Sequence, residues 1–433
     1  MADRNLVAHL LRRATFGPRA EEIDAAARRD YRAVVAELVA PAKPDTARPL
    51  PVFAEDPYFG RAGKLSREQR AAARRAAREQ LTTLAQAWLT RMVHTEQQFA
   101  EKLVFFWHGH WATSAQKVQS ATLMGGQLQT FRAYGRGDFA VLAKAMLRDP
   151  ALILWLDGQR NTAKGPNENL ARELMELFTL GVGAYTEKDV KAAARALTGW
   201  TLDRARGAAV FQAGRHAEGD QSVLGGTVRD ADSLVDVLLA QPAHPVFLAS
   251  RLWLRFGSGE PLPAATREAM VTAYGDRRDV SAMLTAMLLD ERFAATRGQL
   301  VKQPVEWAVG ALRQLGVAPT GKSATAVLTG ARRMGQVPLR PPSVGGWPSG
   351  AAWLTTSSLQ MRMKAAATLA AAVPEPNLAP LHEGDADAKV DAAGRLLAVD
   401  AWTARTRAAL TEAAARPQRL ITLALISPEY AVH

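Results

Sequence analysis

Apolar residues recur at helical spacing along most of this 433-residue chain, whereas the alternation typical of strands is sparse. Clear examples are the segments 234–239, 247–256, 280–289 and 305–315. An amphipathic helix gains most of its stability when its apolar face packs against other elements, so these stripes require a shared core. The sequence therefore predicts a mainly α fold: a single large irregular helical domain with long loops and at most a short β-hairpin.

Capping residues indicate where several of these helices begin. The signals are Ser66, Asp138, a capping box formed by Thr95 with Gln98, and a second formed by Thr186 with Asp189. The first begins a long basic helix that runs to about residue 93, and the second precedes FAVLAKAML. The third begins a helix that runs into FFWHGHW.

Irregular segments rich in proline and glycine separate the helices. The segment 41–63 lacks periodicity, so we expect it to be a long surface excursion. The segment 201–226 is a second irregular stretch, with a short hairpin expected between residues 210–211 and 223–224. The third, RPPSVGGWPSGAAW at 340–353, has a composition that favours a rigid, closely packed loop.

A linker at 374–387 separates two parts of the chain. We expect residues 1–373 to form the helical core domain, and residues 374–433 to contain the linker and C-terminal helices packed on that core. No internal repeat of fixed period is present.

Composition excludes several classes of protein. A hydrophobic content of 48% and a charged content of 22% are those of a globular chain. Because cysteine is absent, disulfides, thiolate metal sites and cysteine nucleophiles are excluded. No apolar run is long enough for a membrane span, and the start MADRNLVAHLLRRATFG lacks the apolar core of a signal peptide. We therefore expect a protein that is cytoplasmic or is exported together with a partner.

The formal net charge of +12 raises the question of a polyanion partner. The densest basic run, SREQRAAARRAAREQ from Ser66 to Gln80, also contains Glu68 and Glu79 and has helical spacing. Charged helix faces of this kind are usually solvated, so a solvated face is favoured here. A basic polyanion-binding module remains the alternative, and nucleic acid is not the favoured partner.

The stretch PNENLARELMELFTLGVG, 166–183, has the features of an amphipathic helix with an unusual polar stripe. Proline and asparagine open it and glycines close it. At 100° per residue, Asn169, Glu173 and Glu176 fall within an arc of about 60°, with Arg172 beside them. The opposite face is apolar.

Two interpretations of this stripe stay open. In the first it faces water, where Glu168 and Arg172 form an ordinary i,i+4 pair. In the second it lines a cleft, where Glu173 and Glu176 share a proton or a metal ion.

The closest histidine pair is His108 and His110. On a helix they point about 200° apart, but on an extended segment they point to the same side. A shared metal therefore requires that the preceding helix has ended by Trp107. With Glu173 or Glu176 the pair would make a site for zinc, iron or manganese. The alternative is that one histidine is packed in the core and the other lies near the surface.

Several motifs together resemble one uncharacterised bacterial family, called domain of unknown function 1800. They are HLLRRATFG at 9–17, FFWHGHWATS at 105–114, PNENLARELMELFTLGVGAYTEKDV, ARALTGW and PPSVGGWPSGAAW. The resemblance covers residues 6–431 and implies a mostly helical fold but no known activity. It also implies a neighbouring partner of the family called domain of unknown function 1501, which is similar to sulfatases and commonly exported.

The resemblance draws attention to the polar residues of the 166–183 stretch. The most recognisable family pattern falls on Asn167, Glu168, Asn169, Arg172 and Glu173. It favours either a functional cleft or a buried polar clasp in which the arginine pairs with the second glutamate.

A second family segment departs from the expected pattern. In FQAGRHAEGDQSVLGG the family leads us to expect an aspartate after the histidine and a lysine nearer the end. This chain has Ala217 and Gln221 there, while His216 remains. If those two residues act in relatives, this member is altered or inactive.

Three functions follow from these observations. The first is a carboxylate-based or metal-assisted hydrolase or transferase, for example on glycans. Its expected catalytic residues are Glu173, Glu176, Arg172 and His216, its substrate-binding residues Asn167, Glu168, Asn169, Trp200 and Trp347, and its metal ligands His108 and His110. The second is a noncatalytic partner of the sulfatase-like neighbour, and the third is the basic polyanion-binding module.

The same motifs give a packing prediction. The segments around His216 and Trp347 should lie against the helix that begins near Asn167, with the tryptophans at 107, 200, 347 and 353 contributing to the contacts.

Overall fold

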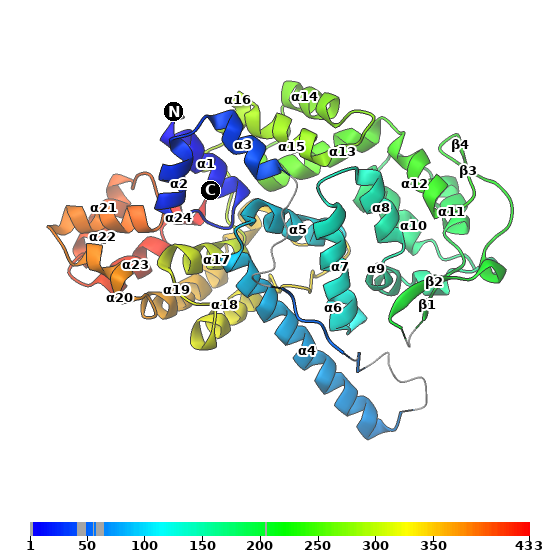
Figure 1. Cartoon of the computed structure of the whole chain (residues 1–433), viewed down its shortest axis with the longest axis horizontal. Coiled ribbons are helices and arrows are strands. Elements are labelled where there is room, and N and C mark those ends of the chain that lie inside the picture. Colours follow the sequence, from blue (N-terminus) through cyan, green and yellow to red (C-terminus); the bar gives the residue numbers. More distant parts are fainter. Residues whose placement is uncertain (1–2, 41–48, 55, 58–64, 204–205) are drawn as a thin grey trace.

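The computed structural model describes residues 3–40, 49–54, 56–57, 65–203 and 206–433 (Figure 1). Most of the predicted excursion at 41–63 lies outside the described residues.

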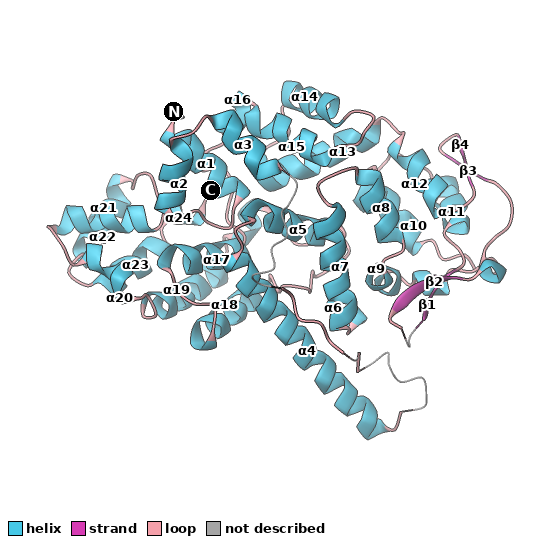
Figure 2. Cartoon of the chain, in the orientation of Figure 1, coloured by secondary structure: helices cyan, strands magenta, loops and turns pink. Residues whose placement is uncertain are grey.

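Helices account for most of the described chain (Figure 2). Those of the first half are α1 (Arg4–Ala14), α2 (Ala20–Ala27), α3 (Tyr31–Val39), α4 (Arg67–His94), α5 (Gln98–His110), α6 (Ala115–Val118), α7 (Ala121–Tyr134), α8 (Phe139–Leu147), α9 (Pro150–Trp155), α10 (Asn169–Glu173) and α11 (Glu187–Ala196). Those of the second half are α12 (Ala231–Leu239), α13 (Ala243–Leu252), α14 (Ala264–Tyr274), α15 (Val280–Leu289), α16 (Glu291–Ala294), α17 (Pro304–Leu315), α18 (Gly321–Arg333), α19 (Thr356–Ala370), α20 (Glu375–Leu378), α21 (Ala386–Leu396), α22 (Ala404–Ala413), α23 (Pro417–Leu425) and α24 (Pro428–Ala431). Two π-helical turns, η2 (Leu174–Thr179) and η4 (Trp253–Gly257), extend α10 and α13. The mainly α prediction is confirmed.

The strands form two small antiparallel hairpins (Figure 2). Strand β1 (Trp200–Asp203) pairs with β2 (Ala208–Phe211), and β3 (Gln221–Val223) pairs with β4 (Gly226–Val228). The single hairpin expected between 210–211 and 223–224 is therefore wrong. Each of these segments pairs with its nearest neighbour in the chain instead, which closes a short loop at a lower entropic cost.

Local capping chemistry accounts for the start of three helices as predicted. Ser66 and Gln69 form a capping box at α4, Asp138 caps α8, and Thr186 caps α11. The predicted box of Thr95 with Gln98 is absent, because the Gln98 amide instead donates to two backbone oxygens at the end of α4.

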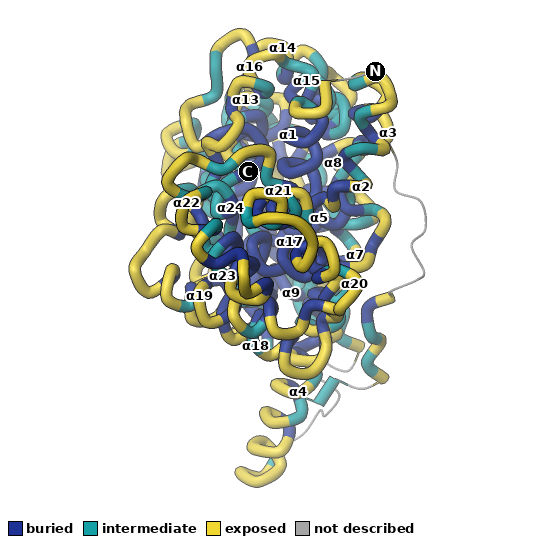
Figure 3. The backbone as a smooth tube through the Cα atoms, turned by 90° about the vertical axis from the view of Figure 1, so that its left-hand side faces the viewer, coloured by how far each residue is buried: buried dark blue, intermediate teal, exposed yellow. Residues whose placement is uncertain are grey.

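Helices α5 and α17 lie at the centre of the molecule. All residues of α17 are buried, and so are most of those of α5 (Figure 3). The C-terminal segment packs on α17, where Trp307 donates to the carbonyl of Leu425 and Tyr430 donates to Gln314. Central burial of these two helices places any polar group they carry in a medium where an unpaired charge is costly.

Helix α4 differs from the others because its first half extends away from the body (Figure 1). Its second half packs through buried residues that include Leu84 and Trp88. Among the described residues, no helix is both long and apolar enough to cross a membrane.

Candidate functional site

The asparagines of the NEN turn hold neighbouring loops together. The side chain of Asn167 accepts from the backbone N–H of Asn169 at 3.0 Å, and the amide of Asn169 donates to the carbonyl of Leu156 at 3.2 Å. The buried Asn161 accepts from the backbone of Asn167 at 2.8 Å and donates to the carbonyl of Ala194 at 2.7 Å. These amides are therefore engaged with backbone groups, and α10 begins at Asn169 rather than at Pro166 or Asn167 as predicted.

Arg172 is held by two glutamates, one of which is the Glu168 of the predicted i,i+4 pair. It donates to Glu187 at 2.6 and 2.8 Å and to Glu168 at 3.1 Å. The predicted clasp between Arg172 and Glu173 is therefore wrong. Residues i and i+1 do not face one another on a helix, whereas Glu168 lies one turn away and Glu187 comes from the facing helix α11.

Glu173 is half-buried and has no hydrogen-bond or ion-pair partner within the described part of the chain. Burial, reinforced by the neighbouring charge of Glu176, raises the pKa of the Glu173 carboxyl, although Arg172 opposes the shift. Glu176 accepts a hydrogen bond from the hydroxyl of Tyr185 at 2.6 Å. The stretch thus presents one free carboxyl beside one that is held in place.

The two histidines of FFWHGHW do not meet the condition for a shared metal, because α5 continues through His110. His108 lies edge-on between the rings of Trp88 and Trp347, with centroid distances of 5.4 and 5.3 Å. His110 instead contacts the carbonyl of Phe178 in η2 at 3.0 Å. In the described ranges, no group of three or more histidine and acidic residues is arranged to hold a metal ion.

His216 is fixed by backbone groups. Its Nδ1 lies 2.9 Å from the carbonyl of Thr198, and its Nε2 lies 3.0 Å from the carbonyl of Arg229. The adjacent position 217, an alanine in this chain, is buried, and the side chain of Gln221 accepts from an arginine of α11 at 3.1 Å. The segment lies against the loop before α10, since Ala163 donates to the carbonyl of the residue before His216.

Trp347, in the 340–353 loop, packs against α5. The prediction that its segment lies against the helix that begins near Asn167 is therefore wrong. Its ring stacks on Phe105 with centroids 5.7 Å apart. The approach is close because Gly346 and Gly109 have no side chains: a Cβ on Gly346 would lie 2.3 Å from the carbonyl oxygen of Gly109. Trp353 is buried, while Trp200 is half-buried and packs on Phe211.

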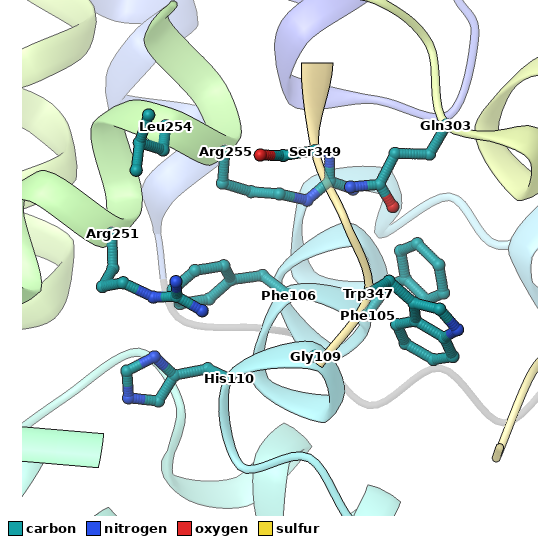
Figure 4. Close-up of a pocket in the computed structure, with 10 residues that line it drawn as sticks. All are labelled: Phe105, Phe106, Gly109, His110, Arg251, Leu254, Arg255, Gln303, Trp347 and Ser349. Carbon is teal, nitrogen blue, oxygen red and sulfur yellow. The ribbon is translucent and has the colours of Figure 1, made fainter. Parts of the chain in front are cut away.

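A cavity of about 90 Å³ opens where α5, η4 and the 340–353 loop meet (Figure 4). Its walls combine aromatic rings with polar side chains that face one another. They are Phe105, Phe106, Gly109, His110, Arg251, Leu254, Arg255, Gln303, Trp347 and Ser349. Two of the motifs singled out in the sequence, FFWHGHW and PPSVGGWPSG, therefore meet at one site.

Arg251 is the most unusual residue of this cavity. Its guanidinium has no hydrogen bond or ion pair among the described residues, and its Nε is fully buried. Burial lowers the pKa of Arg251, as expected for a cation that no acidic side chain compensates. In Figure 4 this guanidinium lies above the imidazole of His110. An unpaired cation in such a position has strong electrostatic attraction for an anion.

Arg255 joins the cavity to a buried cluster of charges. Its Nη2 and the Nζ of Lys102 lie 3.0 and 2.9 Å from the same carboxylate oxygen of Glu306. Burial alone would raise the pKa of Glu306, but Arg255 and Lys102 hold it well below its ordinary value. Burial lowers the pKa of Lys102 to about 8 although Glu306 opposes the shift. Two cations, Arg255 and Lys102, therefore face the single carboxylate of Glu306 behind the cavity. Burial and the neighbouring positive charge of Arg12 lower the pKa of the nearby Lys302 well below its ordinary value.

His110 offers a different chemistry on the same wall. Its Nε2 must carry the proton, because its partner, the carbonyl of Phe178, only accepts. Burial, assisted by Arg251, lowers the pKa of His110 to about 3, so the ring is neutral at pH 7. Its Nδ1, which is buried and without a partner among the described residues, is then a hydrogen-bond acceptor.

The sequence motifs did not indicate four residues of the cavity wall, Arg251, Arg255, Gln303 and Ser349. A signal was present in RLWLRFG, where two arginines four residues apart interrupt an otherwise apolar helical segment. Arginine is rarely buried without a partner, so charges inside an apolar stripe indicate a site.

The residues that line this cavity come from distant parts of the chain, from Phe105 to Ser349. The family described as "Protein of unknown function (DUF1800)" matches residues 9–432. The chain belongs to this family. Comparisons with curated proteins and with solved structures found no match.

Proposed function

We propose that this protein binds a small anionic ligand in the cavity between α5, η4 and the 340–353 loop. The observation that carries the proposal is the Arg251 guanidinium, which lies in the cavity wall without a counter-charge among the described residues. Partial desolvation of a cation without a partner is unfavourable, and a bound anion would offset that cost.

The anionic group of the ligand is a carboxylate or a phosphate. Both match the planar fork of a guanidinium, and two such forks line this cavity. Gln303 adds a donor, because its Oε1 accepts from Gln336 at 2.6 Å while its amide nitrogen has no partner among the described residues. In Figure 4 the side chain of Arg255 extends toward this amide.

The other walls restrict the rest of the ligand. The neutral Nδ1 of His110 requires a donor, so a hydroxyl or an N–H next to the anionic group fits it. The rings of Phe105 and Trp347 form an apolar wall. A volume of about 90 Å³ accommodates a small hydroxy acid or a phosphate ester end, not a large cofactor.

Calorimetric titration with a panel of hydroxycarboxylates and phosphate monoesters tests this proposal. The variant Arg251→Gln removes the unpaired charge, and Arg277→Gln removes an exposed arginine outside the cavity as a matched control. We expect the first to weaken binding at least about tenfold and the second to leave it unchanged. Equal affinities for all three proteins would refute the proposal.

A second candidate is the hydrolase or transferase reaction at Glu173 and Glu176. The free Glu173 carboxyl with its raised pKa supports it, because a general acid needs a carboxyl that holds its proton toward neutral pH. Glu176, held by Tyr185, would be the base or the ligand. Turnover of a glycoside panel that is lost in Glu173→Gln would support this candidate, and its absence in the unmodified protein would remove it.

The resemblance to the family also motivates a noncatalytic proposal, in which the protein binds a sulfatase-like partner. Size-exclusion chromatography of the two purified proteins tests it at low and high salt. A complex that exists only at low salt would reflect general charge attraction rather than a specific interface.

A further inference from the structure

The projecting half of α4 carries an unpaired stripe of arginines. Arg67, Arg70, Arg74 and Arg78 follow one another at intervals of three, four and four residues, so they share one face of the helix. All four are exposed, and none of their guanidinium groups has an ion-pair or hydrogen-bond partner among the described residues. We refer to these four residues as the arginine stripe.

The acidic residues of this half-helix do not neutralise the stripe. Glu68 and Glu79 lie roughly 120° around the helix from its centre, at 100° per residue. Arginines four residues apart on one face repel one another, at about 0.2–0.5 kcal/mol for each pair in an isolated helix. The arrangement is therefore unfavourable for a helix surrounded only by water.

The positive surface continues from the projecting half of α4 onto the body of the protein. Burial lowers the pKa of Arg340, and the nearby charges of Arg332 and Arg78 lower it further. These three arginines come from separate elements and are close enough for their charges to repel one another. Arg332 is exposed near the end of α18, and Arg340 begins the 340–353 loop. The stripe is thus one end of a larger basic surface.

We propose that the arginine stripe docks against an acidic helix of a partner protein. Glutamates at i and i+4 on a helix repeat about every 6 Å, which is the spacing of the arginines on α4. The side chains between the arginines, including Ala71 and Ala72, are small and leave the guanidinium groups accessible to a second helix that lies alongside α4. A membrane surface fits less well, because the exposed part of this half-helix has no bulky apolar residue to insert.

A labelled helical peptide is the probe for this interface. One peptide carries glutamates at intervals of three, four and four residues on one face, and a second has the same composition with the glutamates distributed around the helix. We expect the unmodified protein to bind the first at least about tenfold more tightly, by fluorescence anisotropy at physiological ionic strength, where exposed charges act over about 8 Å.

Two charge-reversal variants distinguish the stripe from net charge. Arg70→Glu with Arg74→Glu changes the stripe, while Arg75→Glu with Arg277→Glu makes the same change in net charge outside it. The first pair should abolish the preference between peptides and the second should preserve it, with circular dichroism confirming helix content in both. Equal binding of the two peptides, or equal loss in both variants, would overturn the proposal. So would tighter binding of duplex DNA or anionic vesicles through the same four arginines.

Discussion

Replacing His108 by leucine should make the protein less sensitive to acid. The side chain is fully buried, and neither ring nitrogen has a hydrogen-bond partner among the described residues. Burial lowers its pKa from 6.5 to about 3. The folded protein therefore keeps this imidazole neutral at pH values where the unfolded chain protonates it.

The sign and size of the effect follow from this difference. Between pH 6.5 and 3 the unfolded chain binds a proton that the folded protein does not, so the free energy of unfolding falls as the pH is lowered. Each pH unit in this window costs about 1.4 kcal/mol, so His108 accounts for a loss of about 3 kcal/mol between pH 7 and pH 4. Leucine has no such loss.

At pH 7 the same substitution should change stability little. Leucine loses the ring contacts to Trp88 and Trp347, worth about 0.5–1.5 kcal/mol each. It also removes two buried, unpaired nitrogens, each of which costs about 1–3 kcal/mol. The two contributions oppose one another, so the net change is neutral or a modest stabilisation.

Urea unfolding curves at pH 7, 5.5 and 4, followed by far-ultraviolet circular dichroism, measure the difference. Met124→Leu is the control, because it changes a fully buried side chain without removing a titratable group. If His108→Leu and the unmodified protein lose the same free energy of unfolding between pH 7 and pH 4, the argument from burial is wrong.

Three further variants test other parts of the structure. Gly346→Ala places a Cβ 2.3 Å from the carbonyl oxygen of Gly109 at a φ of +85°, so it should lower the melting temperature and weaken ligand binding. In the neighbouring Gly345→Ala the Cβ meets only a side-chain oxygen at 3.6 Å, so this control should change neither property. Glu173→Gln should raise the melting temperature slightly at pH 7 and not at pH 3, because the raised pKa means that folding disfavours the ionised carboxyl. Glu306→Gln should cost about 3–5 kcal/mol in chemical denaturation, because it leaves buried cations without their carboxylate.

Local signals predicted the helices well where the chain carries its own capping chemistry. Asp138 and Ser66 lie at N-caps, and the apolar segment 280–289 has the bounds of α15. These features depend on hydrogen bonds within a few residues, which the sequence displays directly.

Features that depend on tertiary contacts were not predictable in the same way. The π-helical turn after Glu173 changes the direction of the following side chains, and its backbone bond from Leu180 to Met175 has no sequence signature. A metal shared by His108 and His110 required α5 to end by Trp107, but burial of that segment favours a helix that satisfies its backbone groups through His110.

The cavity was missed for a related reason. Its polar side chains come from α5, α13 with η4, the start of α17 and the 340–353 loop, so only the folded chain brings them together. The motifs around His110 and Trp347 drew attention to two of its walls. The arginines that give the site its charge lie within the apolar segment 247–256, whose helical spacing by itself predicts only core packing.

The proposed site binds an anion between two guanidinium groups in the cavity. Crystals of the protein soaked in selenate, an anomalous scatterer with the shape of sulfate, test it directly. We expect an anomalous peak within hydrogen-bonding distance of the guanidinium groups of Arg251 and Arg255, and its loss in crystals of Arg251→Gln. Peaks only on exposed arginines elsewhere, with the cavity empty at saturating selenate, would show that the cavity is not an anion site.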